Sequence, residues 1–280
     1  MNFQAFLAQQ SISAIVNQQH PAPLSVAIPF NGTRRWYLAT FDKDQSALYT
    51  QDYLDQVTLR MREVFGWMFA DGVAAVYSPI IGHALATRGE AYMQFGMAAI
   101  TATCTPKALA WHKSKRISVR FYGDRQPLPP DVRDTIAEME HATTFEAPQG
   151  VVYYGIFADQ PLSDIITQTL SLASEADTPP SPEALIHSYY GAAAPTVSIW
   201  IGCDQPTVFD VPLVLSGDSA LYFLTYPTPY FSHLAWRRVL YDYLFVRGDE
   251  ETLFPENLHP ERGILGLGRR QAGYWIPSQA

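Results

Sequence analysis

Two arginines that follow an apolar run and a turn of small residues form a possible anion site near the start of the chain, in the stretch IPFNGTRRW. Asn31 and Gly32 permit a turn with a positive φ angle. The backbone N–H groups of Gly32 and Thr33 can then point at one ligand. Arg34 and Arg35 add charge and forked donors, which together suit a phosphate or a diphosphate. A surface turn with two solvated arginines accounts for the same residues equally well.

Two tyrosines can reach the same region. Tyr53 lies in the segment YTQDY, before the first long helix expected, and Tyr92 lies in RGEAY, after the second strand expected. A phenol can donate to a diphosphate oxygen or orient a water molecule, while its ring faces an apolar substrate or a cation. Simple packing is the more common role of a tyrosine, so both interpretations stay open.

The motifs of several other enzyme classes are missing from the sequence. The histidines form no HExxH pattern, the serines form no GxSxG elbow, and the glycines of GILGLG (263–268) have the wrong spacing for a dinucleotide fingerprint. Cys104 and Cys203 indicate neither a disulfide framework nor a zinc site. The aspartates that could hold magnesium are scattered: Asp42, Asp44, Asp124, Asp204, Asp210 and Asp218. Arginines and backbone dipoles must therefore neutralise much of any bound diphosphate.

Charge and hydropathy exclude two further classes. The net charge of −8 argues against nonspecific binding of nucleic acid, which needs a clustered positive field. No stretch approaches eighteen uninterrupted apolar residues, and the first twenty residues lack the basic start of a signal peptide. We therefore expect a cytoplasmic protein with no membrane span and with buried, reduced thiols.

Strands and helices are expected to alternate along the chain. Apolar runs predict strands over 24–30, 73–80, 116–124, 150–158, 196–202 and 220–226. Helical periodicity and capping residues predict helices from Asp52 to about Asp71, over 83–104, 130–142 and 161–175, within 177–190, and from Ser232 to Gly248. This alternation predicts an α/β fold with a mostly parallel six-stranded sheet flanked by helices, as a single domain over 1–280. In such folds the ligand binds at the carboxyl ends of the strands.

The order of these segments resembles the diterpene synthases of the cis-prenyltransferase fold, a family that includes tuberculosinol synthases, which are also tuberculosinyl transferases, and kolavelool synthases. Undecaprenyl diphosphate synthases have an MDGNGRW turn after the first strand and an IGD segment later; this chain has FNGTRRW and FYGD in that order. The diterpene synthases are similar over nearly the whole chain, and the likeness favours kolavelool synthases. The matching segments are SPI (78–80), RGEAY (88–92), FYGD (121–124), FDVPLVLSG (209–217), ALYF (220–223) and RRVLYD (237–242).

The resemblance implies a reaction and a set of site residues. The implied substrate is a bicyclic allylic diterpenyl diphosphate, namely kolavenyl diphosphate. It would lose its diphosphate, and the cation that remains would capture water to give a tertiary allylic alcohol of the kolavelool type. The sequence has no DxDD motif, so a separate class II cyclase would supply that substrate. Magnesium and a homodimer are implied as well, with no metal ligands assigned. The site residues implied are Asn31, Arg34, Arg35, Tyr53 and Tyr92 for catalysis, Gly32 and Thr33 with both arginines for the diphosphate, and Trp36 and Ile80 for a hydrophobic pocket.

Two departures from the family pattern shape this hypothesis. Asn31 replaces the aspartate that organises magnesium in the relatives, and an amide offers a neutral oxygen without charge. Elongating enzymes bind a second diphosphate with an RTSGE segment, whereas IGCDQPTVFD (201–210) contains no arginine. An unpaired second diphosphate would be costly to desolvate, so we do not expect chain elongation.

Three alternatives use the same residues differently. A prenyl transferase would capture the allylic cation with a nucleoside such as adenosine. A noncatalytic partner subunit of a cis-prenyltransferase would explain the lost aspartate, although the retained arginine pair and tyrosines weigh against it. A binding protein for isoprenoid diphosphates would bind them tightly without releasing diphosphate.

Overall fold

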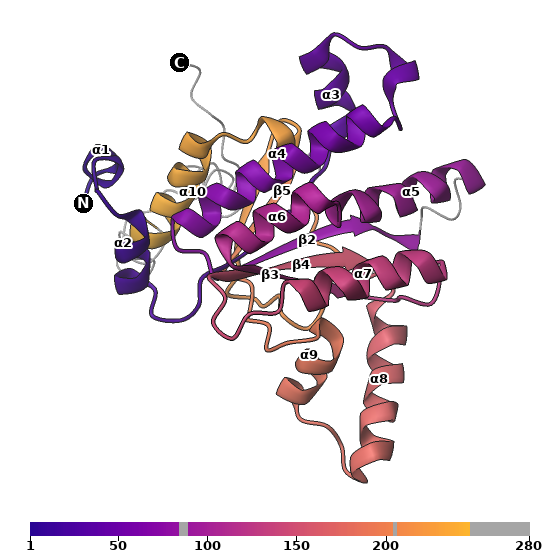
Figure 1. Cartoon of the computed structure of the whole chain (residues 1–280). Coiled ribbons are helices and arrows are strands. Elements are labelled where there is room, and N and C mark those ends of the chain that lie inside the picture. The colour runs from indigo at the N-terminus through magenta and orange to yellow at the C-terminus, as the bar shows by residue number, and fades with distance from the viewer. Residues whose placement is uncertain (84–88, 204–205, 247–280) are drawn as a thin grey trace, which may run out of the picture.

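The sheet has the architecture that the sequence predicts. The computed structural model describes residues 1–83, 89–203 and 206–246 (Figure 1). In this part of the chain a six-stranded sheet has the order β3-β4-β2-β1-β5-β6, and every pairing is parallel. The strands are β1 (Ser25–Ala27), β2 (Ala75–Ile81), β3 (Ile117–Tyr122), β4 (Gly150–Ile156), β5 (Ile199–Cys203) and β6 (Ala220–Leu224).

The helices include those expected and four more. The sequence predicts α4 (Gln51–Ala70), α5 (Glu90–Thr103), α7 (Pro130–Ala142), α8 (Pro161–Ala176), α9 (Pro182–Tyr190) and α10 (His233–Phe245). It does not predict α1 (Phe3–Leu7), α2 (Ile12–Gln19), α3 (Thr33–Phe41) or α6 (Pro106–Lys115). Pro106, taken from the sequence as the end of a helix, starts α6 next to the N-cap Thr105. Gly248, the expected end of the last helix, lies outside the described residues.

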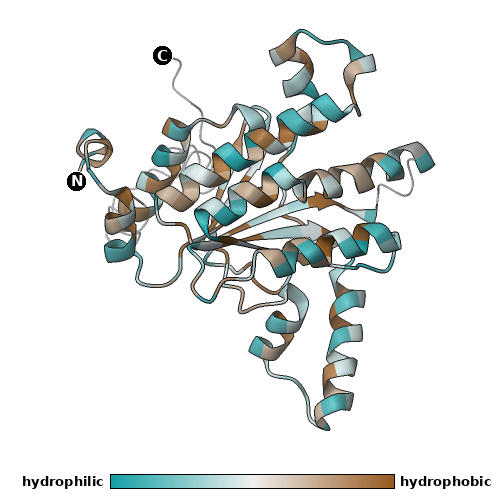
Figure 2. Cartoon of the chain, viewed as in Figure 1, coloured by the Kyte–Doolittle hydropathy of each residue, from teal (hydrophilic) through white to brown (hydrophobic). Residues whose placement is uncertain are grey.

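Alternate strand residues build a core on each face of the sheet. Val76, Val152 and Ile199 pack with residues of α2, α4, α5, α7 and α10 in the larger cluster. Tyr77 and Tyr153, one position further along their strands, join the second cluster with α9 and the chain before β6. In Figure 2 the helices carry both hydrophilic and hydrophobic segments, as amphipathic helices packed on a sheet should.

The second face is held to its covering loop by tyrosine hydroxyls. Tyr77 donates to the carbonyl of Pro195 at 2.6 Å, and Tyr122 donates to the carbonyl of Asp210 at 2.8 Å. Such buried rings fill space while their hydroxyls satisfy loop carbonyls. Burial raises the pKa of the Tyr153 phenol to about 12, so this group stays neutral at physiological pH.

A buried carboxylate joins α4 to α10. Asp71, the C-cap of α4, is 3% exposed. Its oxygens accept hydrogen bonds from Trp236 Nε1 at 3.1 Å and from Arg237 Nε at 3.2 Å and Nη2 at 3.1 Å, and His233 Nε2 lies 3.1 Å away. The carboxylate is therefore fully partnered, which a buried charge requires.

None of the helices in the described part of the chain combines the length and hydropathy that crossing a bilayer would require.

Candidate functional site

The arginine stretch forms the start of a helix at the carboxyl edge of the sheet. β1 lies beside β2, and the pairing continues past its end because Ser78 Oγ donates to the carbonyl of Ile28 at 3.0 Å. Gly32 is the N-cap of α3 with a φ of 75°, and the helix begins at Thr33. The positive φ expected at this turn is thus found at Gly32, but the residues after it are helical and not part of an extended loop.

A second segment of chain fixes this turn. Thr228 belongs to a short 3-10 helix, η3 (Thr228–Tyr230), and is fully buried. Its hydroxyl donates to the carbonyl of Pro29 at 3.0 Å and accepts the N–H of Asn31 at 3.3 Å, while its own N–H donates to the carbonyl of Asn31 at 3.0 Å. The backbone of Asn31 is therefore held in place, and its half-buried side chain extends from a rigid turn.

Both the backbone conformation at position 32 and the atoms around it require a glycine. A Cβ at this position would lie 2.7 Å from Cβ of Pro227, and φ is in the left-handed region. We expect Gly32→Ala to shift the start of α3 and to lower turnover at least tenfold, because a misplacement of about 1 Å at a reacting site can cost about 100-fold in rate. Steady-state kinetics with a melting curve tests this. Gly217→Ala is the control, since nothing lies within 4 Å of a Cβ there; equal activity of the two variants would contradict the prediction.

The N-terminus of α3 has the donors of an anion site. The first N–H groups of a helix have no partner within the helix, and the helix dipole adds partial positive charge there. Gly32 provides no side-chain cap, and the first turn has no acidic residue. Arg34 and Arg35 stand in that turn with exposed side chains. These features are those of a diphosphate-binding turn.

Tyrosines surround the arginine side of this turn. Tyr53 is 4% exposed, and its hydroxyl lies 2.7 Å from Thr33 Oγ1. Nη1 of Arg34 donates to the Tyr49 hydroxyl at 3.2 Å. The rings of Tyr49 and Tyr92 are 5.8 Å apart, centroid to centroid. The structure thus brings Tyr53 and Tyr92 to the arginine turn, together with Tyr49, which the sequence reasoning did not single out although it stands in the same YTQDY segment.

The surroundings of Arg34 favour the charged form of its guanidinium. The hydrogen bond to Tyr49 raises the pKa of Arg34, burial opposes this, and the nearby phenols of Tyr92 and Tyr53 add to the rise. Burial raises the pKa of Tyr53 and outweighs the hydrogen bond with Thr33 and the charge of Arg34. At neutral pH the site therefore offers a fixed cation beside the neutral phenol of Tyr53.

The two residues expected to line a hydrophobic pocket pack in different clusters. Trp36 is 6% exposed and packs with Tyr53 and Leu54 in a small cluster between α3, α4 and α5. Ile80 is half-buried and packs against the larger core instead. Trp36 therefore holds α3 against α4 and α5, and a pocket that both side chains share stays a prediction.

No preformed metal centre accompanies the turn. Among the described residues, no group of three or more histidine, cysteine, aspartate or glutamate side chains is arranged to hold a metal ion. Asn31 offers one neutral amide oxygen, and hard cations such as magnesium prefer charged oxygens. Asp204 lies outside the described residues. The donor set seen here does not fit a magnesium site by itself.

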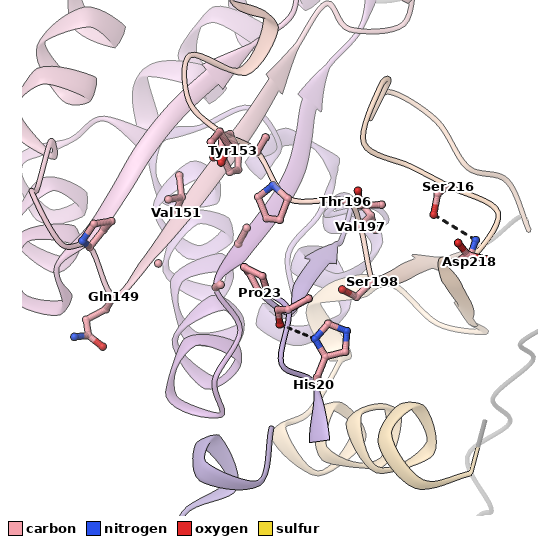
Figure 3. Close-up of a pocket in the computed structure, with 18 of the residues that line it drawn as sticks. His20, Pro23, Gln149, Val151, Tyr153, Thr196, Val197, Ser198, Ser216 and Asp218 are labelled. Atoms are coloured by element: carbon pink, nitrogen blue, oxygen red, sulfur yellow. Dashed lines mark hydrogen bonds between the residues drawn. The ribbon is translucent and has the colours of Figure 1, made fainter. Parts of the chain in front are cut away.

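A pocket of about 850 Å³ lies at the opposite edge of the sheet, where the amino ends of the strands meet (Figure 3). It is lined by Ala75, Gly150 and Ser198, at or next to the amino ends of their strands, and by His20 and Asp218. The lining residues include no arginine or lysine. Because a diphosphate needs positive charge, we place the candidate site at the carboxyl edge.

Solved structures with the same architecture identify the fold. A probable undecaprenyl diphosphate synthase from Campylobacter jejuni aligns with a TM-score of 0.61 over 80% of this chain and 96% of its own, at 13% identity. The chain has the cis-prenyltransferase fold. Lavandulyl diphosphate synthase from Lavandula x intermedia, solved with dimethylallyl diphosphate, shares the fold with a TM-score of 0.64 over 80% of this chain and 95% of its own, at 15% identity.

One sequence relative aligns with almost the whole length of this chain. The tuberculosinyl adenosine transferase of Mycobacterium tuberculosis (strain CDC 1551 / Oshkosh) is 27% identical over 286 residues, which span 95% of this chain and 94% of the relative. No protein-family model matches the chain.

The motif segments fall on defined elements of the fold. SPI lies in β2, FYGD at the end of β3, ALYF in β6 and RRVLYD in α10, whereas Arg88 of RGEAY lies outside the described residues.

Proposed function

We propose that this protein is a diterpene synthase that ionises a bicyclic allylic diterpenyl diphosphate and adds water to the resulting cation. Kolavenyl diphosphate is the proposed substrate and a tertiary allylic alcohol of the kolavelool type the product. The observation that carries the proposal is the start of α3, where an uncapped helix N-terminus and two arginines meet three tyrosines at the carboxyl edge of the sheet. The likeness to a tuberculosinyl transferase adds support for a diterpenyl substrate.

The first step breaks the bond between the allylic carbon and the diphosphate oxygen, and both electrons leave with the oxygen. Negative charge therefore grows on the leaving group as the bond lengthens. Arg34, Arg35 and the N–H groups at the start of α3 bind that charge more strongly in the transition state than in the substrate. Asn31 stands beside the same group as a neutral hydrogen-bonding side chain, on a backbone fixed by Thr228.

The second step concerns the allylic cation that remains. The faces of the Tyr53 and Tyr92 rings can stabilise positive charge. Water that attacks the internal carbon of the allyl system gives the tertiary alcohol and one proton. Trp36 acts in this proposal as the support of α3, and Ile80 as a wall near the end of β2.

Transfer of the diterpenyl group to a nucleoside is the second candidate function. It is favoured by one specific observation, the relative named for transfer to adenosine. The ionisation step would be the same, and an adenine nitrogen would replace water as the nucleophile. A noncatalytic subunit would not need the uncapped helix start beside two arginines, so we rank it lower. A binding protein would use the same donors, and it differs from the enzymes in releasing no diphosphate.

Several accompanying properties are part of the proposal. We propose a single catalytic domain over 1–280 that acts in the cytoplasm as a homodimer on a substrate made by a class II cyclase. Magnesium would bind with the substrate and supply charge that Asn31 does not; side chains of this protein would contribute little beyond the amide oxygen of Asn31.

The test is turnover with defined substrates. Purified protein is incubated with bicyclic and acyclic diterpenyl diphosphates and magnesium, with and without adenosine, while diphosphate release is measured and products are separated by mass spectrometry. We expect diphosphate release and an alcohol without adenosine. Adenosine consumption in step with diphosphate release would support the transferase instead. No release with any isoprenoid diphosphate would exclude both enzymes.

A further inference from the structure

A histidine and several aspartates meet at the carboxyl edge of the sheet, and the reaction described so far gives them no role. His83 follows β2, and Asp124 and Asp159 follow β3 and β4. Asp164 of α8 and Asp210 of the segment before β6 interact electrostatically with the same group. All five belong to the described part of the chain, and they come from five separate segments.

Asp159 contacts both the backbone N–H and the ring of His83. The main-chain N–H of His83 lies 2.8 Å from each carboxylate oxygen of Asp159, and ring Nδ1 lies 2.7 Å from Oδ1. Burial raises the pKa of Asp159, but the hydrogen bonds from His83 outweigh it and the net pKa is lowered. The carboxylate is thus charged and accepts, so Nδ1 donates to it, and Nε2 is the ring nitrogen that remains to exchange a proton.

The residue before His83 has to be a glycine for this contact to form. A Cβ on Gly82 would lie 2.9 Å from both Cγ and Oδ2 of Asp159. The His83 ring also packs against Phe157, with centroids 5.1 Å apart. The ring is therefore fixed on two sides, while 27% of the side chain stays exposed.

Nε2 of His83 is left without a hydrogen bond from the described residues around it. Oδ2 of Asp124 lies 4.0 Å from Nε2, which is beyond hydrogen-bond distance but within reach of an ion pair once the ring is protonated. An imidazole whose Nδ1 is oriented by a carboxylate and whose Nε2 is open to a further partner is the arrangement of a general base.

A buried hydroxyl of α9 belongs to the same cluster. Tyr189 is 3% exposed, and its hydroxyl interacts with the Asp164 carboxylate: burial raises the pKa of Asp164, and hydrogen bonding to Tyr189 opposes that larger rise. By normal hydrogen-bond geometry neither the hydroxyl nor Oδ2 of Asp164 is satisfied. The charges that act on this phenol are Asp164, Asp210, Asp124 and Asp159. A water molecule beside this pair would complete the hydrogen bonding of both groups.

This cluster and the arginine turn lie on neighbouring strands. The arginine turn follows β1 and His83 follows β2, and these strands pair in parallel, so both segments leave the same edge of the sheet. Burial raises the pKa of Asp210 to about 6, and the charge of Asp159 adds to the rise, so negative charge is costly here and a proton is readily taken up.

We propose that the cluster binds the water molecule that quenches the allylic cation, and that Nε2 of His83 takes its proton. The inference rests on the proposed function. The carbon–oxygen bond to diphosphate breaks with both electrons on the leaving oxygen, a lone pair of water forms the new carbon–oxygen bond, and one water proton passes to Nε2. Asp159 balances the imidazolium that forms, which then loses its proton to solvent.

This role affects which product forms more than how fast the substrate is consumed. Ionisation is driven at the arginine turn, and the cation it leaves reacts quickly with whatever lies nearest. A cation with no oriented water loses a proton and becomes a diterpene hydrocarbon. A tenfold change in the ratio of alcohol to hydrocarbon corresponds to a change of about 1.4 kcal/mol in the difference between the activation free energies of water capture and of proton loss.

The experiment compares His83→Gln with His141→Gln, a control at an exposed histidine of α7. We expect His83→Gln to release diphosphate within about threefold of the wild-type rate and to lower the alcohol-to-hydrocarbon ratio about tenfold or more, with no change in the control. Asp159→Asn, checked for its melting temperature, should shift the ratio in the same direction because it removes the acceptor that orients the ring.

The outcomes separate the two proposals. If the wild-type protein makes the alcohol and His83→Gln gives the same product ratio, the role of His83 is wrong while the proposed function stands. If His83→Gln lowers diphosphate release and leaves the ratio unchanged, His83 serves ionisation and the inference is also wrong. If the wild-type protein releases no diphosphate from any substrate, both proposals fail.

Discussion

Arg34→Ala lowers kcat about 10²–10³-fold while the protein stays folded, because the variant loses a charged donor at the point where negative charge develops. Arg34 is exposed in the first turn of α3 and is oriented by its hydrogen bond to Tyr49. Its removal leaves no buried group unpaired, so the free energy of unfolding should change by less than about 0.5 kcal/mol. Steady-state kinetics and a urea titration measure the two effects separately. Arg35→Ala is expected to have a similar effect.

Two further variants identify the cause of that loss. Arg34→Lys keeps the charge but not the fork, and it should recover only part of the rate. Arg133→Ala removes an exposed arginine from α7 and should have wild-type kinetics. Wild-type rates in Arg34→Ala and Arg35→Ala would show that the diphosphate binds elsewhere.

Asp71→Ala should destabilise the fold by about 3 kcal/mol, without a direct effect on the reacting groups. The carboxylate is 3% exposed and accepts from Trp236 and Arg237. Its loss leaves the buried Trp236 N–H unpaired and the Arg237 guanidinium without its counter-charge. The expected value lies at the low end for a broken buried pair because 27% of the Arg237 side chain is exposed and can be hydrated.

A urea titration of the variant beside wild type measures this. Asp134→Ala, at an exposed position of α7, is the matched control and should stay within about 0.5 kcal/mol of wild type. A loss below about 1 kcal/mol in Asp71→Ala would show that the contacts of Asp71 with α10 add little to stability.

The strands and most helices could be predicted because their signals are local. α7 begins at Pro130 and ends at Ala142, as the proline and the apolar spacing indicate. α3 could not be predicted because its start breaks the usual rules: Gly32 gives no side-chain cap, and two arginines occupy a first turn where the dipole favours acids. Such local conflicts are common at functional sites, and here the conflict falls at the proposed diphosphate-binding turn.

Other features of the site depend on contacts between distant segments. The hydrogen bonds that fix Asn31 come from Thr228, 197 positions away, and His83 meets Asp159 across 76 positions. The spacing of residues in a single sequence does not indicate which distant residues pair. The shared pocket of Trp36 and Ile80 stays a prediction for a similar reason: hydrophobicity indicates burial but not which cluster a side chain joins, and the two side chains pack in different clusters.

The central claim is that the bond between carbon and the diphosphate oxygen breaks and that water then attacks carbon. Turnover of a bicyclic diterpenyl diphosphate in water enriched in oxygen-18, followed by mass spectrometry of both products, tests it most directly. The account predicts one oxygen-18 atom in the tertiary alcohol and none in the released diphosphate. Oxygen-18 in the phosphate product and none in the alcohol would show attack at phosphorus, and would contradict the account.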